Sequence, residues 1–80
     1  MPLRMINNMP IIIAPTDTEL TVVRIAGNDK TVQHLRELGI VPSMRCRLLS
    51  SEPSGIIIRI GDSRLALDRE LAKLITVSVA

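Results

Sequence analysis

The stretch KTVQHLRELGIVPSMRCRLL, residues 30–49, contains a helix signal followed directly by a strand signal. Apolar residues at helical spacing predict a short amphipathic helix over about residues 30–38. Gly39 follows at the position where a helix C-terminus favours a left-handed residue. Beyond Pro42 the apolar residues recur at every second position, which predicts a strand. The fold therefore has a helix inserted between strands.

Short strands are predicted on both sides of this stretch, because β-branched residues dominate between turn signals. Three isoleucines between two prolines predict a short buried or edge strand, and SSEPSG predicts a turn. Asp68 can cap a helical turn over about residues 68–74, and Gly61-Asp62-Ser63 predicts a tight hairpin. The predicted strands cover residues 11–13, 20–26, 44–48, 56–60, 64–67 and 75–79.

These elements predict a mostly β fold, a small closed or half-closed barrel of five to six short strands with one helix and one helical turn. Eighty residues are enough for one domain only. We expect that domain over residues 11–80, with residues 1–10 as a loose lead-in. The apolar run near the start is too short to span a membrane and lacks the features of a signal peptide.

The composition disfavours several classes of function. The chain has no Phe, Tyr or Trp, so it lacks the aromatic platforms on which single-stranded nucleic acid stacks. Its net charge of +2 is scattered, whereas a binder of phosphate backbones carries a denser basic stripe. A single cysteine excludes an internal disulfide and favours the cytoplasm. We therefore expect a cytoplasmic protein that does not bind nucleic acid.

No residue pattern predicts catalysis, a resident metal or a cofactor. His34 is the only histidine and lies on the predicted helix, without a second ligand nearby in sequence. Cys46 alternates with apolar residues and reads as a small buried hydrophobe. The four methionines could hold a soft metal, but prolines and asparagines around Met5 and Met9 argue against a helix that would align them. An enzyme is not expected.

One surface points to a partner. If the strand after the helix pairs antiparallel with the strand before the hairpin, Arg45 falls opposite Arg59, and Arg47 falls opposite Ile57. Facing arginines repel unless an anion or a carboxylate joins them. Leu49 and Ile57 would be exposed on the same face. Two interpretations stay open: a solvated sheet surface, or a mixed basic and apolar patch that docks a partner.

The chain resembles the FeoA family, small SH3-like domains associated with bacterial ferrous-iron uptake, over about residues 12–79. HLRELGIVPSM, residues 34–44, is similar to the family pattern Leu-x-x-Leu-Gly-Ile/Leu-x-Pro-Gly. IRIGDSRLALDRELAKLITV, residues 58–77, is similar to the family's hairpin, helical turn and last strand. Ser43 stands where the family has glycine, and Asp17-Thr18-Glu19 stands where it has Pro-Gly before the first long strand.

The resemblance implies a non-enzymatic accessory protein that binds and regulates the FeoB-type GTP-dependent iron permease at its cytosolic side. The expected groove lies between the helix, the connection over residues 39–43 and the loop over residues 50–55, which makes Gly39 and Pro42 candidate contacts. The family also resembles the C-terminal domain of DtxR-type repressors. The alternative is therefore a metal-responsive or nucleic-acid-binding barrel. The exposed edges of such a barrel would also allow a homodimer.

Overall fold

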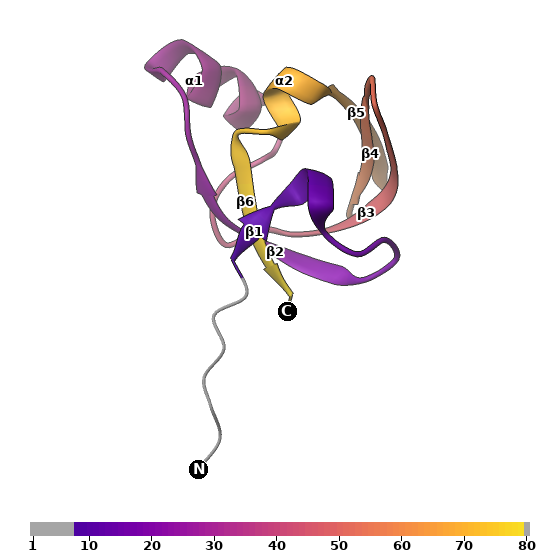
Figure 1. Ribbon diagram of the computed structural model, residues 1–80. Coiled ribbons are helices and arrows are strands. Elements are labelled where there is room, and N and C mark those ends of the chain that lie inside the picture. Colours follow the sequence, from indigo (N-terminus) through magenta and orange to yellow (C-terminus); the bar gives the residue numbers. More distant parts are fainter. Residues whose placement is uncertain (1–7, 80) are drawn as a thin grey trace.

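Six antiparallel strands form one strongly curved sheet in the computed structural model, which describes residues 8–79 (Figure 1). The strand order is β1-β6-β2-β3-β4-β5, so the last strand lies between the first two. This mostly β architecture is an SH3-like barrel, and the predicted fold class is confirmed. The strands are β1 (Met9–Pro10), β2 (Glu19–Ile25), β3 (Arg45–Glu52), β4 (Gly55–Ile60), β5 (Ser63–Asp68) and β6 (Ile75–Val79).

Two α-helices lie together at one end of the barrel, α1 (Asp29–Glu37) and α2 (Arg69–Ala72) (Figure 1). The Asn28 side chain accepts a hydrogen bond from the Thr31 amide at 2.8 Å and so caps α1. Asp68 caps α2 in the same way, through the Leu71 amide at 2.8 Å. Both predicted helical segments are confirmed, with α1 beginning and ending one residue earlier than expected.

The three isoleucines after Pro10 do not form the predicted strand. They form a 3-10 helix, η1 (Ile11–Ile13), closed by the Ala14 amide donating to the Ile11 carbonyl at 3.1 Å. In the predicted buried or edge strand Ile11 and Ile13 would share one face, whereas in the structure Ile11 is fully buried and Ile13 is 66% exposed. Met9 and Pro10, expected in the lead-in, pair instead with β6. Residues 1–7 of that lead-in lie outside the described residues.

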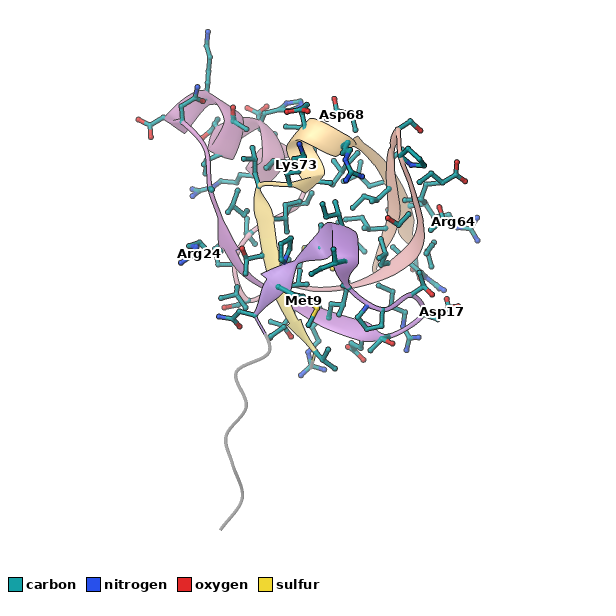
Figure 2. The ribbon with its side chains drawn as sticks, in the orientation of Figure 1. Met9, Asp17, Arg24, Arg64, Asp68 and Lys73 are labelled. Carbon is teal, nitrogen blue, oxygen red and sulfur yellow. The ribbon has the colours of Figure 1, made fainter. Side chains whose placement is uncertain are left out.

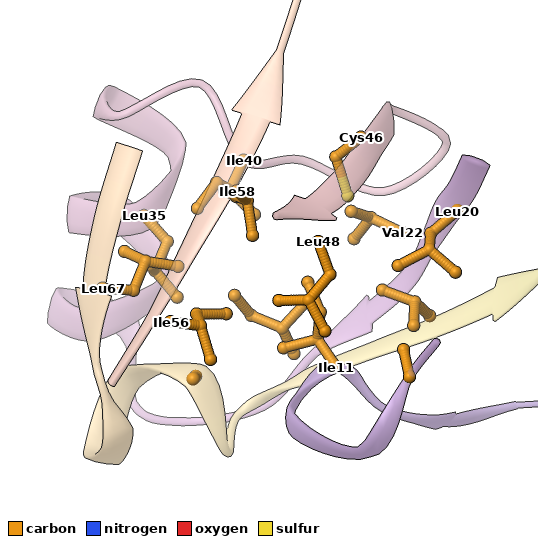
Figure 3. Packing of buried hydrophobic residues seen from close by; sticks show 14 residues of the cluster. Ile11, Leu20, Val22, Leu35, Ile40, Cys46, Leu48, Ile56, Ile58 and Leu67 are labelled. Carbon is orange, nitrogen blue, oxygen red and sulfur yellow. The ribbon is translucent and has the colours of Figure 1, made fainter. Parts of the chain in front are cut away.

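The core is built from aliphatic side chains and one cysteine, as the absence of aromatic residues requires (Figure 3). Within residues 8–79 no polar or charged residue is buried, so the interior contains no side chain able to act as an acid, base or ligand other than the Cys46 thiol. The buried residues are Ile11, Ala14, Leu20, Val22, Leu35, Ile40, Cys46, Leu48, Ile56, Ile58, Leu67, Ala72, Ile75 and Val77.

The pairing of β3 with β4 differs from the predicted register. The predicted turn over residues 50–55 is much tighter, because Glu52 pairs with Gly55 and leaves only two residues between the strands. A β-bulge at Leu49 then shifts the ladder by one residue, since Leu48 faces Ile58 while Ser50 faces Ile57. Arg47 therefore lies opposite Arg59, and the predicted pairs of Arg45 with Arg59 and Arg47 with Ile57 are wrong.

The two positions that depart from the family's glycines keep a left-handed backbone. Ser43 has a φ of 78° and Asp17 a φ of 57°, and they are the two non-glycine residues with positive φ among residues 8–79. Aspartate tolerates this region better than most residues, whereas serine is strained in it. The Ser43 amide donates to the Val22 carbonyl at 2.7 Å, which holds the strained turn against β2.

Candidate partner-binding surface

Three arginines stand in a row across the outer face of the barrel. The strand registers place Arg47 of β3 opposite Arg59 of β4, and Arg59 opposite Arg64 of β5. All three side chains are exposed. Neighbouring strands lie about 4.8 Å apart, so the row spans about 10 Å. We call Arg47, Arg59 and Arg64 the arginine row. Glu19 of β2 lies opposite Arg47 and ends the row on that side.

Local hydrogen bonds restrict two members of the row. Arg47 Nη1 donates to the Asp17 carbonyl oxygen at 3.1 Å, and Arg59 Nε donates to the Gly61 carbonyl oxygen at 3.1 Å. Each bond uses one donor, which leaves the rest of each guanidinium for a ligand. Arg64 has no side-chain hydrogen bond within residues 8–79, and Figure 2 shows it pointing outward from β5. The row is thus partly ordered and still open to solvent.

The Glu19 carboxylate, on β2 opposite Arg47, is paired with Arg45. Glu19 Oε2 lies 3.3 Å from Arg45 Nη1, with 44% and 70% of the two side chains exposed. Surface pairs of this kind contribute little to stability. Among residues 8–79 the other ion pair joins Glu70 of α2 to Lys73, the residue after this helix, so no carboxylate lies within 4.0 Å of a guanidinium of the arginine row.

An open depression of about 570 Å³ lies along this part of the sheet. Its basic lining comes from Arg45, Arg47 and Arg59, and Leu49 contributes its apolar part, so four of the predicted partner-binding residues lie together. Burial raises the pKa of the Cys46 thiol, which keeps it protonated and a poor nucleophile. The full lining is Asp17, Glu19, Arg45, Cys46, Arg47, Leu49, Arg59 and Gly61.

A second hollow, of mixed polar and apolar lining, adjoins the arginines on the same face. Ile57 precedes Arg59 by two residues on β4, so both side chains point outward. Ile57 is 40% exposed and lies opposite Ser50 on one side and Ala66 on the other. These residues line a hollow of about 340 Å³ that also includes Glu52 and Asp68 at the far end of the strands. Basic and apolar side chains are therefore adjacent on this face.

The remaining predicted contacts lie elsewhere. Pro42 lines a hollow of about 170 Å³ with residues of α1 and β2, among them Val32 and Arg36. Gly39 lines none of these hollows; its amide and that of Ile40 close the end of α1. The predicted groove between helix, connection and hairpin loop is thus divided, because the loop residues line the hollow around Ile57 instead.

Sequence reasoning missed Arg64, Asp17 and Glu19. The signal for Arg64 was available: Gly61-Asp62-Ser63 was predicted as a tight hairpin connection, and a turn of two residues there sets Arg59 opposite Arg64. The positions of Asp17 and Glu19 depend on the pairing of β2 with β3, which are far apart in the sequence. That contact leaves no local pattern in the residues.

The described residues offer no cluster for metal or acid–base chemistry. Within residues 8–79, no three His, Cys, Asp or Glu side chains converge on a point that could hold a metal ion. His34 lies on the exposed side of α1, away from the arginine row. No helix in the described part of the chain is long and apolar enough to cross a membrane.

Comparisons with known proteins match almost the whole described chain to one domain family. The family model of the FeoA domain matches residues 9–79. A crystal structure of an iron uptake regulatory protein (FeoA) is 30% identical with a TM-score of 0.83, and the match covers 91% of this chain and 99% of that one. An FeoA-like protein from Clostridium acetobutylicum is 22% identical with a TM-score of 0.78, over 94% and 90% of the two chains.

The same fold occurs inside larger proteins. A manganese-dependent transcriptional repressor matches with a TM-score of 0.85 at 18% identity, over 98% of this chain but only 45% of the repressor. At this identity the likeness concerns the fold alone. No curated protein sequence matches the chain.

Proposed function

This chain belongs to the FeoA domain family, and from that membership we propose that it is a non-enzymatic accessory protein of bacterial ferrous-iron uptake. In this proposal it binds the FeoB-type permease at the cytosolic side of the membrane and regulates transport. The observation that carries the proposal is the extent of the match: the FeoA domain model accounts for residues 9–79, and an FeoA structure is covered almost from end to end.

The surface around the arginine row is the proposed contact. Arg45, Arg47, Leu49 and Arg59 line one depression, and Ile57 lies beside it. Interfaces combine an apolar centre with arginines, and this face offers both on a rigid sheet. The interior holds no polar side chain among the described residues, which supports a role through the surface rather than through chemistry.

Calorimetric titration tests this function. The full chain is titrated into the isolated cytosolic domain of the ferrous-iron permease from the same cell, with guanosine diphosphate, with a non-hydrolysable triphosphate analogue, and without nucleotide. Saturable binding supports the accessory role, and an affinity that differs between the nucleotide states supports regulation of the transport cycle. Absence of binding in all three states, with both proteins folded, contradicts a direct contact with that domain.

A matched pair of variants locates the contact. Arg45→Glu removes a lining arginine and reverses its charge, whereas Arg36→Glu makes the same change on α1, outside the depression. We expect the first variant to weaken binding to the permease and the second to leave it unchanged. Equal affinities for both variants would place the contact on another face of the barrel.

A further inference from the structure

The arginine row brings three positive charges close together on adjacent strands. Arg47, Arg59 and Arg64 carry like charges on directly opposed positions of three adjacent strands, and like charges so placed repel each other. No carboxylate of the described chain lies within ion-pair distance of them, because Glu19 pairs with Arg45. A ligand with several negative charges would relieve this repulsion across the whole row at once.

The length of the row defines how much ligand it can contact. Two steps between strands span about 10 Å, and an extended peptide rises about 3.3 Å per residue, so about four residues cross the row. Arginine presents a planar fork of donors that matches a carboxylate. The hollow that contains Ile57 and Ala66 lies beside the row, and these two apolar side chains can contact one uncharged side chain of a ligand.

Acidic groups lie at the β2 end of the arginine row and farther along the strands beyond Ile57, and they disfavour a longer polyanion. Glu19 and Asp17 lie at the β2 side of the depression, and Glu52 and Asp68 lie beyond Ile57. A nucleic-acid strand that continued past Arg47 would meet Asp17 and Glu19, and it would find no aromatic side chain on which to stack its bases. A short acidic segment of a protein ends before it reaches them.

We propose that the arginine row binds a short acidic segment of the partner protein, about four residues long, that carries an apolar side chain beside its carboxylates. This inference rests on the proposed function for the identity of the partner, and it adds the chemistry of the recognised segment. The segment lies across β3, β4 and β5, with its carboxylates on the arginines and its apolar side chain against Ile57.

The probe for the test is a capped hexapeptide of five glutamates and one leucine, added to the isotopically labelled full chain and followed by amide chemical shifts. The same peptide with glutamines in place of the glutamates is the uncharged control, and an oligothymidylate is the nucleic-acid control. We expect shifts centred on the arginine row with the acidic peptide only, and a loss of affinity on addition of salt.

Three variants separate the row from the general charge of the molecule. Arg59→Gln and Arg64→Gln each remove one charge from the row, and Arg36→Gln removes one from α1. We expect the acidic peptide to bind each row variant roughly two- to fivefold more weakly and the Arg36→Gln variant unchanged. Arg64 makes no side-chain hydrogen bond within residues 8–79, so its variant tests binding with the least effect on folding.

The outcomes distinguish this inference from the proposed function. No binding of the acidic peptide, equal effects of all three variants, or tighter binding of oligothymidylate at the row would overturn the inference. Permease binding that is unaffected by Arg59→Gln and Arg64→Gln would also overturn it while the proposed function stands. If instead the acidic peptide binds as expected and the permease domain does not bind, the inference stands and the proposed partner is wrong.

Discussion

Arg47 and Arg59 lie directly opposite each other on β3 and β4, with both side chains on the exposed face of the barrel. Cross-strand pairs of like charge destabilise a sheet, and pairs of opposite charge stabilise it by a comparable amount. This pair therefore lowers the stability of the free protein. A surface on which two arginines repel each other in this way is suited to contact with a ligand of the opposite charge.

The first prediction concerns this pair. Arg59→Glu places a carboxylate between Arg47 and Arg64, so we expect the free energy of unfolding to rise by about 0.5 kcal/mol, from the lost repulsion and the gained attraction. The same variant should bind the permease domain more weakly. Urea denaturation at low salt measures the first effect, and calorimetry measures the second.

Arg36→Glu is the control for the charge change alone, because Arg36 lies on α1 and takes no part in the ladder of β3, β4 and β5. Arg59→Glu also removes the hydrogen bond from Arg59 Nε to the Gly61 carbonyl. If the free energy of unfolding falls by more than the loss of that bond explains, the repulsion across β3 and β4 does not contribute measurably to stability.

The second prediction concerns Gly55, where the hairpin of β3 and β4 passes close to β5. A Cβ atom added there would lie 2.4 Å from the Leu67 carbonyl oxygen, which is backbone and cannot turn away. We expect Gly55→Ala to destabilise the protein by about 1–3 kcal/mol, as overpacking does. Thermal denaturation checks this. Gly61→Asn is the control, since nothing lies within 4 Å of that position and asparagine tolerates its φ of 57°.

The third prediction concerns the strained turn at Ser43. Its φ of 78° costs a residue with a side chain about 1–2 kcal/mol, and glycine avoids that cost. Glycine also loses more conformational entropy on folding, which offsets part of the gain. We expect Ser43→Gly to raise the free energy of unfolding by about 1 kcal/mol. Ser54 lies at an exposed turn position and does not have a positive φ, so Ser54→Gly should lower the free energy of unfolding. Equal changes in the free energy of unfolding for the two variants would contradict the prediction.

The fourth prediction concerns the helix cap at Asn28. Asn28→Ala removes the acceptor of the Thr31 amide and should cost about 1 kcal/mol of stability. Asn28→Ser should restore most of that loss, because serine caps helices nearly as well as asparagine. Chemical denaturation followed by circular dichroism compares the three proteins. A serine variant as unstable as the alanine variant would show that the cap bond contributes little.

The fifth prediction is a dependence on pH from Cys46. Burial raises the pKa of its thiol in the folded protein above the ordinary value of 9.0. The folded state therefore holds a proton that the unfolded state releases, so this contribution to stability is complete below about pH 9 and is lost as the pH rises toward the folded pKa. The loss approaches about 1.4 kcal/mol per pH unit.

Urea denaturation across this range, compared with Cys46→Ala, isolates the contribution of the Cys46 thiol. The free energies of unfolding of the two proteins should differ in their slope against pH, and not only by a constant amount. Parallel curves would show that the thiol reaches water in the folded state.

Local patterns were sufficient for the elements that local interactions determine. The spacing of apolar residues around Leu35 predicted α1, and Asp68 predicted the cap of α2, because cap and helix face are set within a few residues. Alternation predicted which residues of β3 and β4 point inward, and Cys46, Leu48, Ile56 and Ile58 are buried as a result. The outward arginines follow from the same alternation.

Features that depend on the meeting of distant segments were not predictable in this way. The bulge at Leu49 shifts the ladder, and no residue type in that segment marks it. Ile11–Ile13 has the composition of a strand, but the ladder of β1 with β6 ends at Pro10, and the segment turns into a 3-10 helix that buries Ile11 in the core. The pair of Glu19 with Arg45 likewise requires the fold to be known.

The place of β6 in the sheet has a consequence for biosynthesis. This strand pairs with both β1 and β2, yet of these three it leaves the ribosome last. Until it emerges, the nascent chain can form the meander of β2 to β5, while β2 keeps an unpaired edge that other chains could join. A premature stop within β6 would therefore release a protein that keeps most of its strands but has an unpaired edge at β2. We expect such a product to aggregate or to be degraded rather than to bind the partner.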